Sequence, residues 1–333
     1  MGGHRGRRKV LTVLDFGHIN VTPGLDIQTF VGQSTTTLIT WQTWRKPRGA
    51  KMVYMLAVGG GSSGGTGVNT AVSSGGGAGG GTGGQSSLLI PAMFLPDVLY
   101  IQAGQGGAPI ITSGGVGAIG TPTYVTIEAA NAVIAQATVL FATAGPVTGA
   151  AATASAGGVA GSAAAVATLA NMPLGARGQS TLLAGQAGSA GGSGVPAIGG
   201  TVTIPLTGLI VTGGTGGGGA NASVATGSNG GPINLTTAML GTEFFSSLIG
   251  GVGSATSTPS LPGMPGYSAK NFMMNYGGTG GGGTSNTAGG NAGAGGDAAP
   301  GSGGGGAGAP TTTNTTVPRS GAGGPGFVII ISF

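Results

Sequence analysis

Long glycine-rich tracts, each joined to a short apolar run, are the feature that most constrains how this chain can fold. The stretch VGGGSSGGTGVNTAVSSGGGAGGGTGG (residues 58–84) directly follows MVYMLAV (residues 52–58), and the chain contains 79 glycines in 333 residues. Ordering a glycine in a regular element costs roughly 0.5–1 kcal/mol more than ordering an alanine. Such tracts are therefore either flexible linkers or densely packed backbone.

The rest of the composition favours ordered backbone. Disordered segments usually combine low hydrophobicity with high charge. This chain has a mean hydropathy of +0.34. Charged residues make up only 5% of it, against about 25% in typical soluble domains. An unfolded chain with so few charges would have little to keep its copies apart. We therefore expect a folded glycine structure held within a larger assembly.

Apolar runs and glycine tracts alternate along the chain. The repeat is loose and has no fixed solenoid period, but one heptapeptide, GGTGGGG, occurs twice, at residues 213–219 and 277–283. The apolar runs favour short strands; they are VLTVL (10–14), MVYMLAV (52–58), LLIPAMFLPDVLYI (88–101), IPLTGLIV (204–211), KNFMMNY (270–276) and FVIIISF (327–333). The Ala-rich stretch 142–172 is the only helix candidate, and its Gly and Thr content weakens it.

These observations predict the fold class: mostly β and irregular, with little α-helix. Collagen needs a strict Gly-X-Y repeat with abundant proline, which this chain lacks. The alternative is a polyglycine-II-like helix with three residues per turn, whose N–H and C=O groups point outward and must be bonded by neighbouring tracts. Small residues stand at almost every third position from Gly277 to Ala307, with Asn286 the exception. We expect a bundle of such helices bracketed by β-strands.

Two regions differ in charge and composition. Residues 1–44 form a basic, β-rich segment that we interpret as an attachment segment, and residues 45–333 form the glycine-rich domain. The basic start of the chain could be a solvated terminus, or it could contact an acidic partner or nucleic acid; its candidate contact residues are Arg5, Arg7, Arg8 and Lys9. The uncharged interval between Glu128 and Arg177 is rich in Ala, Gly, Ser and Thr rather than Leu, Ile or Phe, so we expect no membrane span.

Several stretches resemble a known family. TWRKPRGAKMVYMLAVGGGSSGGTG, SGGGAGGGTGG, LLIPAMFLPDVLYIQAGQGG and the closing GGPGFVIIISF look like the glycine-rich domain of tailed-phage virion proteins, over residues 41–110 and 321–333. Related in style are tail-fibre adhesins, in which glycine helices form a sandwich and loops at one end recognise the host surface. The resemblance implies an exposed virion component with a structural or adhesive role. Residues 1–40 lie outside it.

The residues needed for catalysis are scarce. The two histidines, His4 and His18, are both near the N-terminus, there is no cysteine, and the six acidic residues are widely spaced. No zinc-ligand spacing, carboxylate pair or lysine-bearing phosphate loop is present. We therefore expect no enzyme activity, no metal site and no cofactor.

Large residues that do not fit a glycine bundle are candidates for binding. A cluster at 244–276, interrupted by turns such as LPGMPGY, includes the candidate surface-recognition aromatics Tyr267, Phe272 and Tyr276. Aromatic residues on loops of a rigid scaffold often recognise partners. The alternative interpretation is that these side chains fill a small core or a subunit interface.

The leading hypothesis is a non-enzymatic phage structural protein of the virion surface, resembling a fibre or adhesin. Its expected partners are other virion proteins and a host surface receptor, and its scarcity of charge favours a homo-oligomer, either a trimer or an assembly of many copies. The alternative is a capsid-associated protein whose basic N-terminus contacts the packaged nucleic acid. A third class, an ice-binding slab of polyglycine helices, needs a strict Gly-X-X register that most of the chain lacks.

Overall fold

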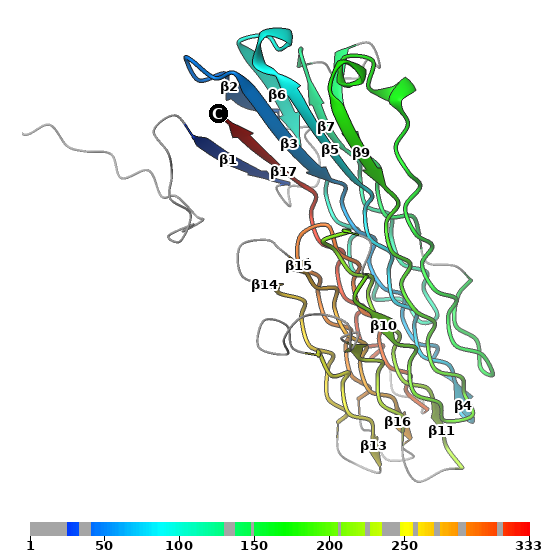
Figure 1. Cartoon of the computed structure of the whole chain (residues 1–333). Helices are drawn as coiled ribbons and strands as arrows, with labels where there is room; N and C mark the ends of the chain where they lie inside the picture. The colour runs from blue at the N-terminus through cyan, green and yellow to red at the C-terminus, as the bar shows by residue number, and fades with distance from the viewer. Residues whose placement is uncertain are drawn as a thin grey trace, which may run out of the picture.

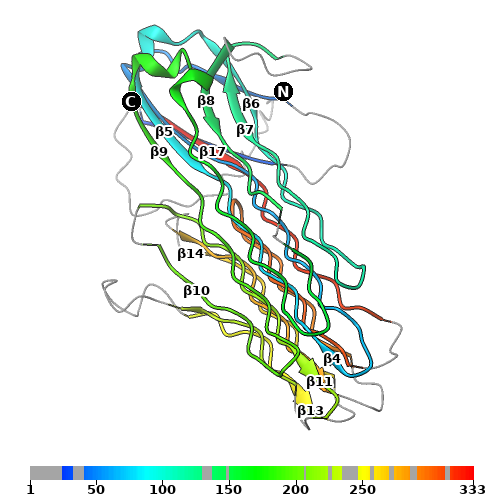
Figure 2. The ribbon, with the colours of Figure 1, turned by 90° about the vertical axis from the view of Figure 1, so that its right-hand side faces the viewer.

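A computed structural model describes most of the chain, namely residues 25–32, 41–129, 137–147, 150–205, 208–223, 227–234, 247–255, 259–269, 274–285, 291–311 and 316–333. The longer strands gather at one end of an elongated molecule (Figure 1), and we call this end the head. Long irregular segments run side by side from the head to the opposite, distal end, and the view turned by 90° shows the same alignment (Figure 2). We call these segments the shaft.

The first head sheet has the strand order β1-β17-β3-β5-β9 and is antiparallel throughout. Its central strand β3 covers Met52–Val58, the bounds that the apolar run predicts. The chain-terminal strand β17 lies between β1 and β3, so strands from opposite ends of the sequence are paired (Figure 1). The remaining members are β1 (Asp26–Val31), β17 (Phe327–Ser332), β5 (Gln85–Pro91) and β9 (Gln179–Leu183).

The second head sheet has the order β2-β6-β7-β8, also antiparallel. Its strands are β2 (Gln42–Arg45), β6 (Val98–Gln102), β7 (Thr123–Thr126) and β8 (Thr138–Ala142). Fully buried side chains from both sheets form the main apolar core, among them Trp44, Val53, Met55, Leu88, Leu99 and Ile101. The other face of the first sheet packs on Leu209 and Val211, which belong to the apolar run predicted at 204–211.

The predicted boundary at residue 44 falls within a strand. β2 covers residues 42–45 and is paired with β6, and β1 is paired with β17. The described part of the N-terminal segment therefore belongs to the head sheets. The division at residue 44 stays a prediction about the whole segment, because residues 1–24 and 33–40 lie outside the described part, as does the run predicted at 10–14.

The described residues contain no α-helix. The 3-10 helices that lie wholly within the described ranges are η1 (Ala92–Phe94), η3 (Leu169–Asn171) and η4 (Gly175–Arg177). After Ala142, the last residue of β8, the described part of the Ala-rich stretch 142–172 is irregular until η3. The mostly β and irregular fold class is confirmed. Short strand pairs complete it, namely β4 (Ser73–Ser74) with β11 (Ala220–Asn221), β10 (Val202–Thr203) with β12 (Ile233–Asn234), β13 (Ser254–Ala255) with β16 (Thr284–Ser285), and β14 (Ser268–Ala269) with β15 (Met274–Asn275).

Backbone hydrogen bonds in the shaft repeat every three residues. In the segment 59–66, successive N–H groups donate to different neighbouring segments in rotation. Residues 59, 62 and 65 donate to residues 84, 81 and 78, residues 60, 63 and 66 donate to 121, 118 and 115, and residues 61 and 64 donate to 324 and 321. The segment thus has three different acceptors around its axis, which a β-strand with two edges does not have.

Carbonyl groups of the same segment accept bonds from further neighbours. Gly60, Gly61 and Ser62 accept from Gly145, Gly107 and Gly304, respectively. The segment is therefore bonded on all sides within the shaft. The same rotation recurs in other inner segments. In the segment 76–83, the N–H groups of residues 76, 79 and 82 donate to residues 192, 189 and 186, and those of residues 77, 80 and 83 donate to residues 307, 304 and 301. Residues 215 and 218 donate to residues 278 and 281, and residues 303, 306 and 309 donate to residues 212, 215 and 218.

Glycine is required where inner segments touch. A β carbon built on Gly80 would lie 2.2 Å from the carbonyl oxygen of Ser62, and one on Gly303 would lie 2.0 Å from the carbonyl oxygen of Gly80. These distances are far below van der Waals contact. The absence of side chains lets the backbones approach closely enough to bond directly, so glycine contributes to the packing and is not slack linker here.

Buried hydroxyl groups replace a backbone neighbour at several places. The Oγ of Ser62 accepts a hydrogen bond from the N–H of Gly81 at 2.8 Å, and the Oγ1 of Thr82 accepts one from the N–H of Gln186 at 2.8 Å. Both Ser62 and Thr82 are fully buried. The Ser62 hydroxyl thus satisfies a buried N–H, and the Thr82 hydroxyl satisfies a partly buried one.

Candidate recognition surfaces

The structure brings two of the three predicted aromatics together. The rings of Tyr267 and Tyr276 stack with centroids 4.8 Å apart and an interplanar angle of 23°. Tyr267 is 38% exposed, whereas Tyr276 is fully buried. The third candidate, Phe272, lies outside the described residues. Tyr267 is therefore the one member of the described pair that can contact a partner.

Tyr276 belongs to a small apolar cluster at the side of the shaft. Its neighbours there are Val202, Ile204, Ile233, Leu248 and Met274. Burial raises the pKa of the Tyr276 hydroxyl far above its ordinary value, and the adjacent Tyr267 raises it further. Tyr276 is thus a neutral, buried ring on which the Tyr267 ring stacks. Of the two interpretations of the aromatics, Tyr276 fits the one in which they fill a small core.

The stretch LPGMPGY (residues 261–267) is an extended shaft segment and not the turn that its prolines and glycines suggest. Gly263 and Gly266 donate to the carbonyl oxygens of Ala294 and Asp297 at 2.8 and 2.6 Å. Pro262 and Pro265 are exposed. Proline has no backbone N–H, so at these solvent-facing positions no hydrogen bond to a neighbouring segment is lost. In LPGMPGY a large residue, a proline and a glycine recur with a period of three residues. This period is the sequence signal that could have predicted a shaft segment.

Every third residue of this segment forms a ridge of large apolar side chains. We call Leu261, Met264 and Tyr267, with exposures of 57%, 42% and 38%, the flank ridge. Ile249 and Val252 on the neighbouring segment are also exposed, and the N–H of Leu261 donates to the carbonyl of Val252. The same three-residue spacing of exposed apolar residues recurs on other segments, at Val116 and Ile119 and at Val195 and Ile198.

The distal end of the shaft presents a second surface. Strands β4 and β11 pair there with the register Ser74–Ala220 and Ser73–Asn221, and we call this pair the distal ribbon (Figure 1). Val72 next to it is 68% exposed. The N–H of Ala222, next to β11, donates to the carbonyl of Val72, next to β4, at 2.8 Å. This bond extends the contact between the two segments beyond the strands.

Side-chain hydrogen bonds hold the distal ribbon in shape. The Oδ1 of Asn221 accepts from the N–H and the hydroxyl of Ser223 at 2.9 and 2.7 Å. The hydroxyl of Ser73 donates to the carbonyl of Ala154 at 2.7 Å, and the N–H of Thr70 donates to the Oγ of Ser74. The result is a fixed, uncharged surface of hydroxyl, amide and methyl groups. No aromatic or charged residue marks this surface, so the sequence does not predict it.

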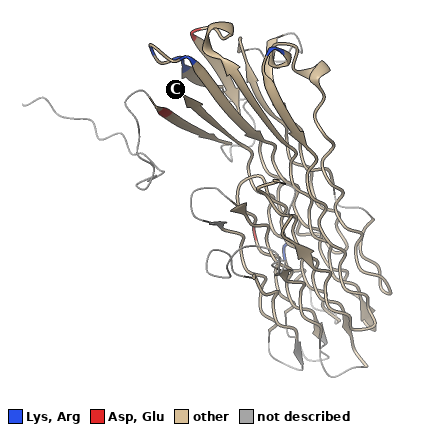
Figure 3. Ribbon diagram, in the orientation of Figure 1, with Lys and Arg blue, Asp and Glu red and all other residues tan. Residues whose placement is uncertain are grey.

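Charge is distributed unevenly over the molecule. In the described ranges, the shaft carries a single ion pair, between Arg319 and Asp297 at 2.6 Å, and the other charged residues lie in the head (Figure 3). Asp297 also accepts from the N–H of Ala322 at 2.8 Å. The candidate nucleic-acid or acidic-partner residues, Arg5, Arg7, Arg8 and Lys9, lie outside the described residues, as do both histidines.

Within the ranges that the structure describes, no group of three or more His, Cys, Asp or Glu residues could hold a metal ion, and no helix is long and apolar enough to cross a membrane. No known protein-family model and no curated protein matches the chain.

Proposed function

We propose that the shaft is a bundle of polyglycine II helices. Such helices have three residues per turn and no internal hydrogen bonds, so each N–H must find an acceptor on a neighbour, and the neighbour must change with every residue. The rotation of donors along residues 59–66 through three different segments supports this assignment. The close approach of backbones at Gly80 and Gly303 supports it as well.

We further propose that the protein is a non-enzymatic structural component of a phage virion, exposed on the particle and resembling a fibre or adhesin. The observation that carries the proposal is the position of the distal ribbon. The shaft holds it at the end opposite the head sheets (Figures 1 and 2). A bonded shaft keeps this surface in one geometry, which lowers the entropy cost of binding. The head then faces other virion proteins, and the distal end faces the host surface.

A homo-oligomer is part of the proposal. The flank ridge and the exposed Ile249 and Val252 form an apolar, uncharged strip along the shaft. Apolar strips on an elongated body are a common means of lateral association. A fibre or adhesin requires that the copies lie parallel, so that their distal ribbons are at the same end.

The proposal is tested with antibodies raised against the purified chain. Immunogold electron microscopy of particles of the encoding virus should place the label on the outside of the virion, and the same antibodies should reduce adsorption to host cells. A soluble chain added before infection should also compete with the particles. A chain carrying Val72→Asp should compete poorly, whereas the control Val159→Asp, also exposed on the shaft, should compete as well as the parent chain. Particles that carry no label would contradict a virion location.

A further inference from the structure

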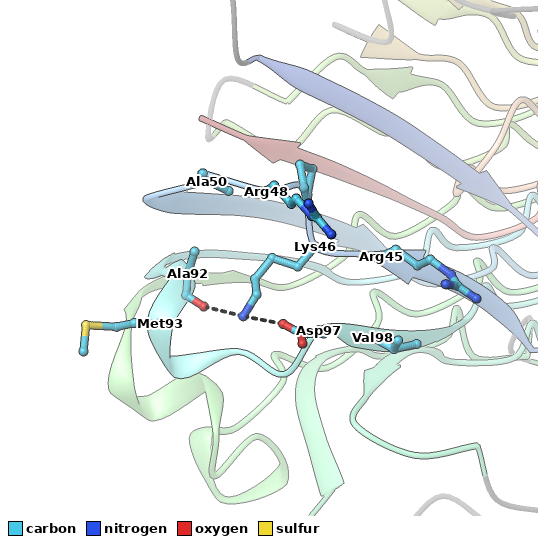
Figure 4. A pocket seen from close by; sticks show the side chains of 10 residues that line it. Arg45, Lys46, Arg48, Ala50, Ala92, Met93, Asp97 and Val98 are labelled. Carbon is cyan, nitrogen blue, oxygen red and sulfur yellow. Dashed lines mark hydrogen bonds and ion pairs between the residues drawn. The ribbon is translucent and has the colours of Figure 1, made fainter.

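A pocket of about 460 Å³ opens in the head, away from the distal end. It lies between the end of β2, the turn that follows β2, η1 and the start of β6 (Figure 4). Three cationic residues contribute to its lining, namely Arg45, Lys46 and Arg48. We call it the head pocket.

Lys46 is held in place by the pocket wall. Its Nζ lies 3.1 Å from the Oδ1 of Asp97 and donates to the carbonyl oxygen of Ala92 at 3.4 Å (Figure 4). It also donates to the carbonyl oxygen of Leu95 at 2.8 Å. The N–H of Lys46 also donates to the carbonyl of Asp97 at 2.9 Å. These bonds tie β2 to the loop before β6 and offset the charge of Lys46 locally.

Two positive charges of the pocket are left without a partner among the described residues. Arg45 and Arg48 are exposed, and neither forms an ion pair or a side-chain hydrogen bond in the described part of the chain. Asp97 is the one acidic residue in the lining, and Lys46 already binds it. The pocket therefore carries excess positive charge, which attracts anions and disfavours cations.

Apolar surface lies next to these charges. Ala50, Ala92, Met93 and Val98 also line the pocket, and the Met93 side chain is 81% exposed. Phe94, which follows Met93 in η1, is 48% exposed. Arg45 and Met93 lie at opposite ends of the pocket (Figure 4), so it suits an extended ligand that carries carboxylates at one place and an apolar side chain at another.

We infer that the head pocket binds an acidic segment of a partner protein, with a carboxylate at Arg45 and Arg48 and an apolar residue against Met93. The lining contains no aromatic ring on which a base could stack, which favours an acidic protein segment over a single-stranded nucleic acid. The pocket lies in the head, so a partner bound there leaves the distal ribbon free. This inference goes beyond the proposed function, because it concerns charge recognition at the head and does not depend on what the distal end contacts.

The probe is a fluorescein-labelled peptide of alternating Glu and Leu, titrated into the full chain and followed by fluorescence anisotropy. A peptide of alternating Gln and Leu is the matched control. We expect the Glu peptide to bind, the Gln peptide to bind at least about tenfold more weakly, and added salt to weaken the Glu peptide. Equal binding of the two peptides would overturn the inference.

Variants then locate the binding site. Arg45→Ser with Arg48→Ser should weaken the Glu peptide about tenfold or more, whereas Arg177→Ser, which removes a head cation outside the pocket, should leave it unchanged. Asp97→Asn should strengthen binding, because it removes the competing carboxylate. All variants are first checked for an unchanged melting temperature. Two outcomes would overturn the assignment to an acidic protein segment. One is that the peptide loses its binding only in a chain that lacks Arg5, Arg7, Arg8 and Lys9. The other is that a single-stranded oligonucleotide binds the pocket more tightly than the peptide.

Discussion

The side-chain oxygen of Thr215 accepts a hydrogen bond of 2.8 Å from the backbone N–H of Gly280, which lies in a neighbouring shaft segment. The same hydroxyl donates to the carbonyl of Gly231 in a further segment. Thr279 occupies the matching place in the second GGTGGGG copy and bridges Met264 and Ile249 in the same manner. The repeated heptapeptide is thus a unit in which one threonine joins two neighbouring backbones.

Removing this hydroxyl should destabilise the shaft. Thr215→Val keeps the shape of the side chain but leaves the N–H of Gly280 and the carbonyl of Gly231 without their bonds, at a cost of about 1–3 kcal/mol for each buried group. Thr215→Ser keeps the hydroxyl and should lose less free energy of unfolding than Thr215→Val. Guanidinium unfolding monitored by circular dichroism gives both free energies. Equal stability of the Val variant and the parent chain would show that the bridge is unimportant.

Adding one methyl group to an inner glycine should be more damaging. In Gly303→Ala the new β carbon would lie 2.0 Å from the carbonyl oxygen of Gly80, so the two segments must separate. Gly49 provides a control, because its φ is +85° but no atom lies within 4 Å of an added β carbon. Gly49→Ala should cost only about 1–2 kcal/mol of backbone strain. Thermal unfolding should show the Gly303 variant to be much less stable; similar losses in both would argue against close packing.

The direction of each N–H along the flank ridge can be tested with proline. The N–H of Met264 donates to the Oγ1 of Thr279 at 2.7 Å, whereas Pro265 stands at an exposed place with no N–H. Met264→Pro should therefore cost roughly 1–3 kcal/mol, and Pro265→Ala should cost less than about 1 kcal/mol. Met264→Ala controls for the lost side chain. Chemical denaturation measures all three, and a Met264→Pro variant as stable as Met264→Ala would mean that this N–H is not bonded.

The raised pKa of Tyr276 predicts a loss of stability in alkali. An unfolded tyrosine loses its proton near pH 10, while the buried Tyr276 keeps its proton at that pH. Above about pH 10 the unfolded state therefore binds fewer protons, and the free energy of unfolding should fall by up to about 1.4 kcal/mol per pH unit. Below pH 10 this residue causes no change.

Unfolding measured between pH 8 and 11 checks the expectation. Tyr276→Phe should make the alkaline fall shallower. Part of the fall should remain, because burial also raises the pKa of Tyr124. If the Phe variant and the parent chain lost stability equally, Tyr276 would not be the group responsible.

Strands with large side chains were predictable from the sequence, and their neighbours were not. The bounds of β3 (Met52–Val58) and the position of β17 (Phe327–Ser332) follow from their apolar runs. The pairing of β17 with β1 does not, because nothing in either strand specifies a partner at the other end of the sequence. In the shaft the difficulty is greater, because glycine tracts carry few side chains that could specify which tract lies beside which.

The candidate sites were predictable only in part. Tyr267 is exposed as a binding residue should be, whereas its partner Tyr276 is buried. The composition of LPGMPGY predicts turns, because proline and glycine are the usual turn residues. The hydrogen bonds of Gly263 and Gly266 show that it continues as a shaft segment. The head pocket joins residues 45–50 to residues 92–98, and that contact depends on the pairing of β2 with β6.

Amide hydrogen exchange measured by mass spectrometry tests the central claim most directly. If the glycine segments are bonded to one another as the structure describes, peptides from residues 59–66 and 76–84 should exchange as slowly as peptides from β3 and β5, because opening them requires separating several segments at once. Exchange of these glycine peptides at the rate of an unstructured chain, with the head strands still protected, would contradict the account.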